Sequence, residues 1–378
     1  MKIVINALSA RIGGGQTYLK NLLARLPERA DLEIHVFAPT SLSLPLDARI
    51  RRRTTRWPTG NPVLRTLWEV LVLPVILARE RAEVLFCPGG VIASRTPPGC
   101  KTVTMFRNMM PFDLATIARI PFGLQKVRNL LLRRSMLRSM ANADLTIFIS
   151  NYARTLIESQ IVIASPITIP HGISQEFRTS GKSLERPKWL PAGEYLLFVS
   201  RFEVHKHQRE VAEAFCALPT ALRDKYYMMF IGDVSSDKST EISELARRFG
   251  AEERVIIAGP VTYAELPAAY HHAAVNIFAS SCENCPNILL EAMGSGRPLL
   301  SSNVMPMPEF GGDAAEYFSP TDPASIQQVL RRVLEDSVHA RRLGRMAAAR
   351  SEEYDWAVTA RRTWQCIFSV ASGSGGNL

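Results

Sequence analysis

The sequence of 378 residues has no apolar run long enough to cross a bilayer. The longest, LWEVLVLPVIL at 67–77, contains Glu69 and Pro74 and falls short of the roughly 20 residues that a spanning helix needs. The chain starts MKIVINAL, without the basic segment, long apolar stretch and cleavage site of a secretory signal. Its six cysteines are scattered and suggest no disulfide framework. We therefore expect reduced thiols and a cytoplasmic protein.

Common signatures of metal and cofactor sites are also missing. Cys282 and Cys285 form a Cys-x-x-C, but no second such pair and no His-x-x-H completes a zinc site. A redox pair would need its own βαβ unit and an activated thiol. A dinucleotide fingerprint fails because Tyr18 stands where a third glycine is needed after Gly13 and Gly15. We expect no resident metal and no bound cofactor.

Positive charge is concentrated in the first half of the chain. Residues 1–180 hold 24 Lys and Arg against 11 Asp and Glu, whereas 181–378 hold 21 against 24. The basic residues gather in RIRRRTTR (49–56) and in KVRNLLLRRSMLRSM (126–140), where apolar and basic residues interleave. This half is expected to meet an anion, and nucleic acid, anionic lipid and phosphorylated small molecules all remain open. The second segment suits either a solvated helix over the core or a helix lying on anionic lipid.

Short apolar runs alternate with longer helical patterns, which predicts βαβ units and an α/β fold with parallel sheets. The expected strands are 2–7, 32–38, 83–87, 101–106, 145–150 and 167–170, then 195–200, 227–232, 254–259, 275–280 and 298–302. An aperiodic stretch with two prolines, 176–193, is expected to link a domain of residues 1–175 to one of 194–357. Two doubly wound sheets of this kind would face an interdomain cleft with the carboxyl ends of their strands.

Two short segments are suited to binding phosphate. Gly13, Gly14 and Gly15 follow the first expected strand and precede a helix, where backbone N–H groups and the helix dipole favour an anion. The alternative is a plain tight turn. Arg201 and Lys206 follow the first strand of the second domain and could neutralise a diphosphate, although ordinary surface exposure explains many such pairs.

The segment SSCENCPNILLEAMGSGRP, 280–298, carries the most chemistry. Pro286 suits the first turn of a helix that runs to about Met293, so Asn287 and Ile288 would present open N–H groups to an anion. Glu283 lies before this helix. Glu291 lies inside it, where a carboxylate can accept paired hydrogen bonds from vicinal hydroxyls such as those of a ribose.

Taken together, these motifs resemble the retaining GT-B glycosyltransferases of family 4. The resemblance rests on Arg201-x4-Lys206, on Glu283-x7-Glu291 within ENCPNILLEAMGSGRP, and on the glycine-rich loop after the first strand. It covers nearly the whole chain and is strongest over 195–318, where VSRFEVHKHQ, IGD and LLEAMGSGRPLLSS follow in the family's order. It implies two Rossmann-like domains, and a last helix (358–371) that crosses back onto the first domain.

The resemblance also implies roles for individual residues. Arg201, Lys206 and Glu283 would be catalytic, the first two on the diphosphate and Glu283 near the donor sugar. Gly14 and Gly15 would contact the donor phosphate or sugar, Pro286, Asn287 and Ile288 the phosphates, and Glu291 the ribose, with a base pocket near 259–262. The chain contains no Asp-x-Asp, the arrangement with which metal-dependent nucleotide-sugar enzymes commonly hold a cation. A metal-independent reaction is therefore expected.

One departure from the family concerns the first domain. Many relatives carry a histidine after the strand that corresponds to KTVTMF, whereas this chain reads FRNMMPF. Arg107 and Asn108 are therefore the acceptor-side candidates, and His171 is expected to be structural. The expected partners are a nucleotide-sugar donor, a glycan or lipid-linked glycan acceptor in cell-surface polysaccharide synthesis, and an anionic surface at the inner membrane face.

Other interpretations remain. A basic nucleic-acid-binding protein would explain the charge, although no zinc finger, helix-turn-helix or aromatic-studded sheet motif supports it. A silent partner protein could keep the fold without activity. A sugar-nucleotide epimerase or a phosphorylase would share the fold but would need motifs that the sequence does not show.

Overall fold

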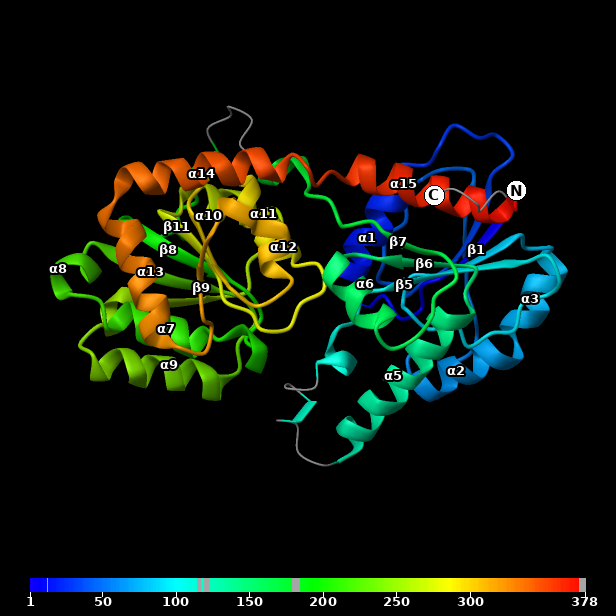
Figure 1. Ribbon diagram of the computed structural model, residues 1–378, viewed down its shortest axis with the longest axis horizontal. Helices are drawn as coiled ribbons and strands as arrows, with labels where there is room; N and C mark the ends of the chain where they lie inside the picture. Colours follow the sequence, from blue (N-terminus) through cyan, green and yellow to red (C-terminus); the bar gives the residue numbers. More distant parts are fainter. Residues whose placement is uncertain (12, 114–116, 119–122, 179–183, 374–378) are drawn as a thin grey trace. The chain divides into compact units, whose positions relative to one another are not determined.

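The computed structural model describes residues 1–11, 13–113, 117–118, 123–178 and 184–373, which form two compact units (Figure 1). The first unit contains Met1–His171 and Trp356–Leu378, and the second contains Gly172–Asp355. Both are α/β layers built on a parallel sheet. The predicted fold class is confirmed.

The sheet of the first unit has the order β3-β2-β1-β4-β5-β6-β7, and its pairs are all parallel. Its strands are β1 (Lys2–Asn6), β2 (Glu33–Phe37), β3 (Ile50–Arg53), β4 (Val84–Cys87), β5 (Lys101–Phe106), β6 (Leu145–Phe148) and β7 (Pro166–Thr168). The winding reverses between β1 and β4, where the ends of doubly wound strands usually bind ligands. The edge strand β3 falls within the basic segment 49–56 and was not predicted, because its sequence IRRR lacks an apolar pattern.

Helices on both sides of this sheet complete the first unit: α1 (Gly14–Leu23), α2 (Pro62–Leu71), α3 (Leu73–Glu80), α5 (Leu124–Asn142), α6 (Asn151–Glu158) and α15 (Trp356–Ala371). The last helix, red in Figure 1, lies along α1. The indole Nε1 of Trp364 donates to the carbonyl of Leu22 at 3.2 Å. The chain's final helix is therefore part of the first unit.

The sheet of the second unit has the order β10-β9-β8-β11-β12-β13, again with parallel pairs. Its strands are β8 (Glu194–Val199), β9 (Tyr226–Ile231), β10 (Val255–Gly259), β11 (Val275–Phe278), β12 (Leu299–Ser302) and β13 (Glu316–Phe318). The first five were expected, whereas the three-residue β13 is too short to recognise by alternation. The winding reverses between β8 and β11.

Alternate residues of β8 show why these runs form buried strands. Leu196 and Phe198 enter one apolar cluster, and Tyr195 and Leu197 enter a second cluster on the other face. Helices cover both faces, as parallel sheets require. They are α7 (Gln208–Cys216), α8 (Thr220–Arg223), α9 (Ser236–Arg248), α10 (Leu266–His272), α11 (Asn287–Gly294), α12 (Met307–Gly311), α13 (Pro323–Glu335) and α14 (Ser337–Ser351).

The predicted linker, 176–193, is not a separate connection where the structure describes it. Phe177 and Leu190 are buried in the core of the second unit. The guanidinium of Arg178 donates to the carbonyl oxygens of Ser351 (3.2 Å) and Tyr354 (2.6 Å). Because these contacts join the segment to the second unit, the chain passes between the units at 171–172 and at 355–356 instead.

No helix within the described ranges is both long enough and apolar enough to span a membrane.

Candidate active site

Two loops meet at the carboxyl ends of the adjacent strands β8 and β11. A short 3₁₀ turn, Val204–Lys206, follows β8, and Glu283 lies in the loop between β11 and α11. The ammonium of Lys206 forms an ion pair with the carboxylate of Glu283, although 77 residues separate them in the sequence. Ser280 Oγ donates to the same carboxylate at 2.8 Å, and Lys206 Nζ lies 5.1 Å from the centre of the Phe278 ring. The structure thus brings two of the predicted catalytic residues into one ion pair, in which Lys206 is buried and Glu283 is partly buried.

Two histidines beside Lys206 hold these loops together. The carbonyl of His205 accepts a hydrogen bond from the Ser281 N–H at 2.9 Å, and His207 Nε2 lies 2.9 Å from Ser281 Oγ. His207 adopts a left-handed backbone conformation, with φ of 52°. Burial lowers the pKa of His205, and the charge of Lys206 lowers it further. The motif HKH therefore positions Lys206, a role that the sequence analysis did not assign.

Arg201 lies on the other side of the β8 terminus from Lys206. Its Nη2 is 3.3 Å from Asp233 Oδ2, in the turn after β9, and both side chains are largely exposed to solvent. Exposed pairs of this kind contribute little to stability. Arg201 therefore pairs with Asp233, which follows β9, whereas Lys206 pairs with Glu283, which follows β11, on the other side of β8. The ion pair of Arg201 can break at little cost in free energy.

The turn after β9 allows this close approach because it contains Gly232. The φ of Gly232 is +147°, and a Cβ placed there would lie 1.9 Å from the carbonyl oxygen of Ser200. No side chain fits that space. The glycine of the predicted IGD segment thus brings the β8 and β9 termini together.

The helix α11 differs from its prediction at its first residues. Pro286 is the N-cap residue and precedes the helix, whereas it was expected within the first turn. The N–H of Asn287 donates to the carbonyl of Cys285 at 3.0 Å, so it is not open to an anion as predicted. The first intrahelical bond runs from the Leu290 N–H to the Pro286 carbonyl. The amides that precede it belong to Ile288 and Leu289, which are the ones suited to an anion.

Glu291 is buried on α11, with about 9% of its surface exposed. Burial raises the pKa of this carboxyl to about 7, and a hydrogen bond from Tyr263 partly opposes the increase. The Tyr263 hydroxyl donates to Glu291 Oε1 at 3.0 Å, and its ring contacts Phe177 edge-on at 5.2 Å between centres. Tyr263 follows the loop 259–262 after β10, which was expected near the base. Its contact with Glu291 was not predicted.

In the first unit, the structure brings Gly15 and Arg107 together. Gly13, with φ of +66°, is the N-cap of α1. A Cβ on Gly15 would lie 3.2 Å from Arg107 Nη1, so the guanidinium packs against the helix backbone. The same guanidinium lies 5.7 Å from the centre of the Tyr18 ring. Asn108 is exposed, and its Oδ1 accepts the Met110 N–H at 3.2 Å.

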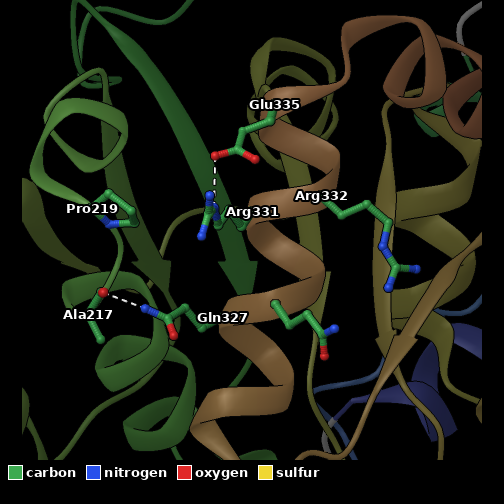
Figure 2. A pocket seen from close by; sticks show the side chains of 7 residues that line it. Ala217, Pro219, Gln327, Arg331, Arg332 and Glu335 are labelled. Atoms are coloured by element: carbon green, nitrogen blue, oxygen red, sulfur yellow. Dashed lines mark hydrogen bonds and ion pairs between the residues drawn. The ribbon is translucent and has the colours of Figure 1, made fainter.

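A surface pocket in the second unit contains none of these residues. Figure 2 shows it beside α13, lined by Ala217, Pro219, Gln327, Gln328, Arg331, Arg332 and Glu335. Two pairs of its lining residues bond to each other: Arg331 Nε lies 2.9 Å from Glu335 Oε1, and Gln327 donates to the Ala217 carbonyl. This pocket does not contribute to the candidate site.

Two family models match the chain in succession. Residues 12–177 match the model described as Glycosyltransferase Family 4, and residues 182–350 match that of Glycosyl transferases group 1. Together they cover most of both units. The chain belongs to the family 4 glycosyltransferases.

Relatives of this glycosyltransferase support the assignment. It is 29% identical over 232 residues to the serotype-specific mannosyltransferase WbdA of Escherichia coli, an alignment of 59% of this chain and 28% of the relative. The chain therefore spans less than a third of that protein. Solved structures with the same fold include sucrose-phosphate synthase from Thermosynechococcus elongatus, with a TM-score of 0.76, 15% identity and coverage of 99% and 100%. Another is Anabaena HepE in complex with UDP-glucose, with a TM-score of 0.72, 16% identity and coverage of 98% and 100%. The predicted GT-B fold is confirmed.

The histidines of the glycosyltransferase's first unit have structural surroundings. His171 is buried between the rings of Tyr18 and Trp356, with centres 5.6 and 5.4 Å away. His35 lies on β2 with its ring nitrogens near Glu33 and Glu80, at 2.8 and 3.4 Å. These contacts support the expectation that His171 maintains the fold.

The described part of the glycosyltransferase contains no group of three or more His, Cys, Asp or Glu side chains arranged to hold a metal ion. Its six cysteines, all within the described ranges, form no disulfide, and Cys282 and Cys285 are not bonded to each other.

Proposed function

We propose that this glycosyltransferase moves a sugar from a nucleoside-diphosphate sugar to an acceptor hydroxyl, with retention at the anomeric carbon. The observation that carries the proposal is the ion pair between the buried Lys206 and the partly buried Glu283, next to the first turn of α11. A buried ammonium is a strong ligand for a diphosphate because the local dielectric is low. Its present partner, Glu283, would then be released beside the donor sugar.

In the proposed reaction, the bond between the anomeric carbon and the diphosphate breaks, and its electrons stay on the diphosphate oxygen. The acceptor oxygen bonds to the same face of the anomeric carbon, and its proton passes to the departing diphosphate. Negative charge therefore grows on the leaving group. Lys206, Arg201 and the amides of Ile288 and Leu289 would stabilise that charge more in the transition state than in the ground state.

We propose that the nucleoside is held by Glu291 and the loop that precedes Tyr263. A carboxylate can accept hydrogen bonds from both ribose hydroxyls, and the Tyr263 hydroxyl already orients Oε1 at 3.0 Å. In the first unit, Gly14, Gly15 and Arg107 are the groups we propose for the donor phosphate or sugar and for the acceptor. The cations Lys206 and Arg201 would replace the metal that other nucleotide-sugar enzymes use, so no metal is proposed.

For the acceptor, we propose a lipid-linked glycan used in cell-surface polysaccharide synthesis at the inner face of a membrane. The mannosyltransferase relative supports a hexose donor, and the basic first half of the chain supports an acceptor close to anionic lipid.

The proposal is tested with purified full-length protein. A thermal-shift panel of UDP, GDP, ADP and their sugars identifies the donor, because a ligand at 100 times its Kd adds about 2.7 kcal/mol of stability. Product analysis then determines the anomeric configuration. Inversion would refute the proposed stereochemistry, and a protein that binds donors without hydrolysis or transfer would be the silent partner considered above.

A further inference from the structure

Helix α2 exposes an apolar stripe to solvent. Its outward residues follow helical spacing and are well exposed: Val63 (68%), Leu67 (43%), Val70 (46%) and Leu71 (60%). Val75, at the start of α3, extends the stripe. The opposite side of α2 is already buried through Trp68 and Glu69. An amphipathic helix normally turns its apolar stripe to the core, whereas α2 also presents one outward.

Helix α5 carries a second exposed apolar group together with positive charge. Leu124 (91%), Val127 (42%), Leu130 (49%) and Leu131 (63%) are exposed in its amino-terminal part. This part extends away from the sheet of the first unit, whereas Met136 and Met140 anchor the other end (Figure 1). The helix contains five basic residues and no Asp or Glu, so no acidic residue of its own compensates them: Lys126, Arg128, Arg133, Arg134 and Arg138.

In the view of Figure 1, both helices lie on the lower side of the first unit. Burial lowers the pKa of Arg65 on α2, the carboxylate of Glu69 opposes this change, and the charges of Arg11 and Arg128 lower the pKa further. The positive charge of Arg128 on α5 therefore acts on a residue of α2. Exposed apolar side chains and positive charge thus occur on the same two helices.

The other basic segment, 49–56, is different because carboxylates pair with three of its five arginines. Arg49 pairs with Asp47 at 2.7 Å, Arg51 with Glu33 at 3.2 Å, and Arg53 with Glu80 at 2.7 Å. Of the two basic segments in the sequence, α5 is therefore the one whose charge is suited to an external anion.

We propose that α2 and α5 together form a docking surface for an anionic lipid bilayer. The exposed Val and Leu side chains enter the level of the lipid headgroups, and the arginines of α5 bind the lipid phosphates. Apolar side chains interleaved with arginines match the layered chemistry of a bilayer surface, where apolar burial and charge attraction add. The role of this surface rests on the proposed function, because it would hold the enzyme at the membrane that contains the lipid-linked acceptor. Binding to lipid itself requires neither a donor nor sugar transfer.

The experiment is co-sedimentation of the full-length protein with vesicles of phosphatidylcholine, with or without phosphatidylglycerol, in the absence of donor. We expect binding to the anionic vesicles, weakened when salt is raised from about 0.05 M to about 0.5 M. The triple variant V63S/L67S/L71S should bind at least about tenfold more weakly. The triple variant R128Q/R134Q/R138Q should lose about 100-fold on anionic vesicles.

A matched control removes three exposed apolar side chains elsewhere, L46S/V162S/V338S, and should bind as the wild type does. Circular dichroism and thermal unfolding verify that each variant is folded. Wild-type protein that ignores anionic vesicles, or an α2 variant that binds them normally, would overturn the docking surface. So would a dimer in solution that V63S/L67S/L71S abolishes without any vesicle binding, because the face would then belong to a second copy. Transfer to a water-soluble acceptor, measured separately, distinguishes these failures from failure of the proposed function.

Discussion

Replacing Lys206 by methionine tests the proposed catalytic pair most directly. The change removes the ammonium and keeps an apolar side chain of similar length against Phe278. Glu283 then loses its ion-pair partner but keeps the hydrogen bond from Ser280 at 2.8 Å. We expect a cost of about 3 kcal/mol in the free energy of unfolding, the lower end for breaking a buried pair. Denaturant unfolding measures this cost.

The same variant should reduce kcat by about 100- to 1000-fold, because one preorganised group no longer stabilises the charge on the leaving diphosphate. Stability and catalysis are separated by the double variant K206M/E283Q. It removes both charges and should recover much of the lost stability while remaining as inactive as K206M. The control K225A removes an exposed lysine of the same unit and should change neither quantity.

Activity is measured with the donor identified by the thermal-shift panel, and donor affinity by calorimetry. A wild-type kcat in K206M, with unchanged stabilisation by nucleoside diphosphates, would refute the role proposed for the Lys206–Glu283 pair. Recovery of activity in K206M/E283Q would mean that Lys206 only neutralises Glu283.

Three further predictions concern Glu291, the β9 turn and metal. Burial raises the pKa of Glu291 to about 7, so between about pH 4.5 and 7 the folded protein keeps a proton on this carboxyl that the unfolded chain has lost. The free energy of unfolding should therefore fall, relative to that of E291Q, by up to about 3 kcal/mol as the pH rises through this range. The affinity for the donor should rise over the upper part of that pH range. The variant Y263F removes the hydrogen bond that lowers the pKa of Glu291, so it should shift the midpoint of this rise to higher pH. A donor affinity that does not depend on pH and that E291Q matches would contradict the ribose role of Glu291. In Gly232→Ala, the new Cβ would lie 1.9 Å from a carbonyl oxygen, so thermal unfolding should show a loss of stability of at least about 3 kcal/mol. The control Gly250→Ala has a φ of +60° and open space around the new Cβ, and it should lose about 1 kcal/mol. Equal losses of stability in the two variants would disprove the steric explanation. Chelator should leave transfer unchanged, and activity that chelator abolishes and manganese restores would refute the metal-free reaction.

Local patterns in the sequence were sufficient for most of the architecture. Buried parallel strands are continuous apolar runs such as YLLFV in β8. Eleven of the thirteen strands in the described ranges were therefore recognisable without knowledge of their neighbours. Helix α11 was recognisable because Pro286 marks its start and glycines mark its end. The two missed strands are β3, which is strongly basic, and β13, which has only three residues. Both form strands because they pair with a neighbouring strand of the sheet, β2 and β12 respectively.

The contacts that define the candidate site depended on the tertiary structure. Lys206 and Glu283 are 77 residues apart, and Tyr263 and Glu291 are 28 apart. Such pairs form because the parallel strands of one sheet bring their carboxyl ends to the same edge, and the sequence reports neither strand order nor side-chain direction. The same is true of the two basic segments, since carboxylates from β2 and α3 neutralise Arg51 and Arg53. The sequence by itself determined which residues could carry the chemistry, whereas packing decided which of them meet, because contact depends on distances in space that no local pattern encodes.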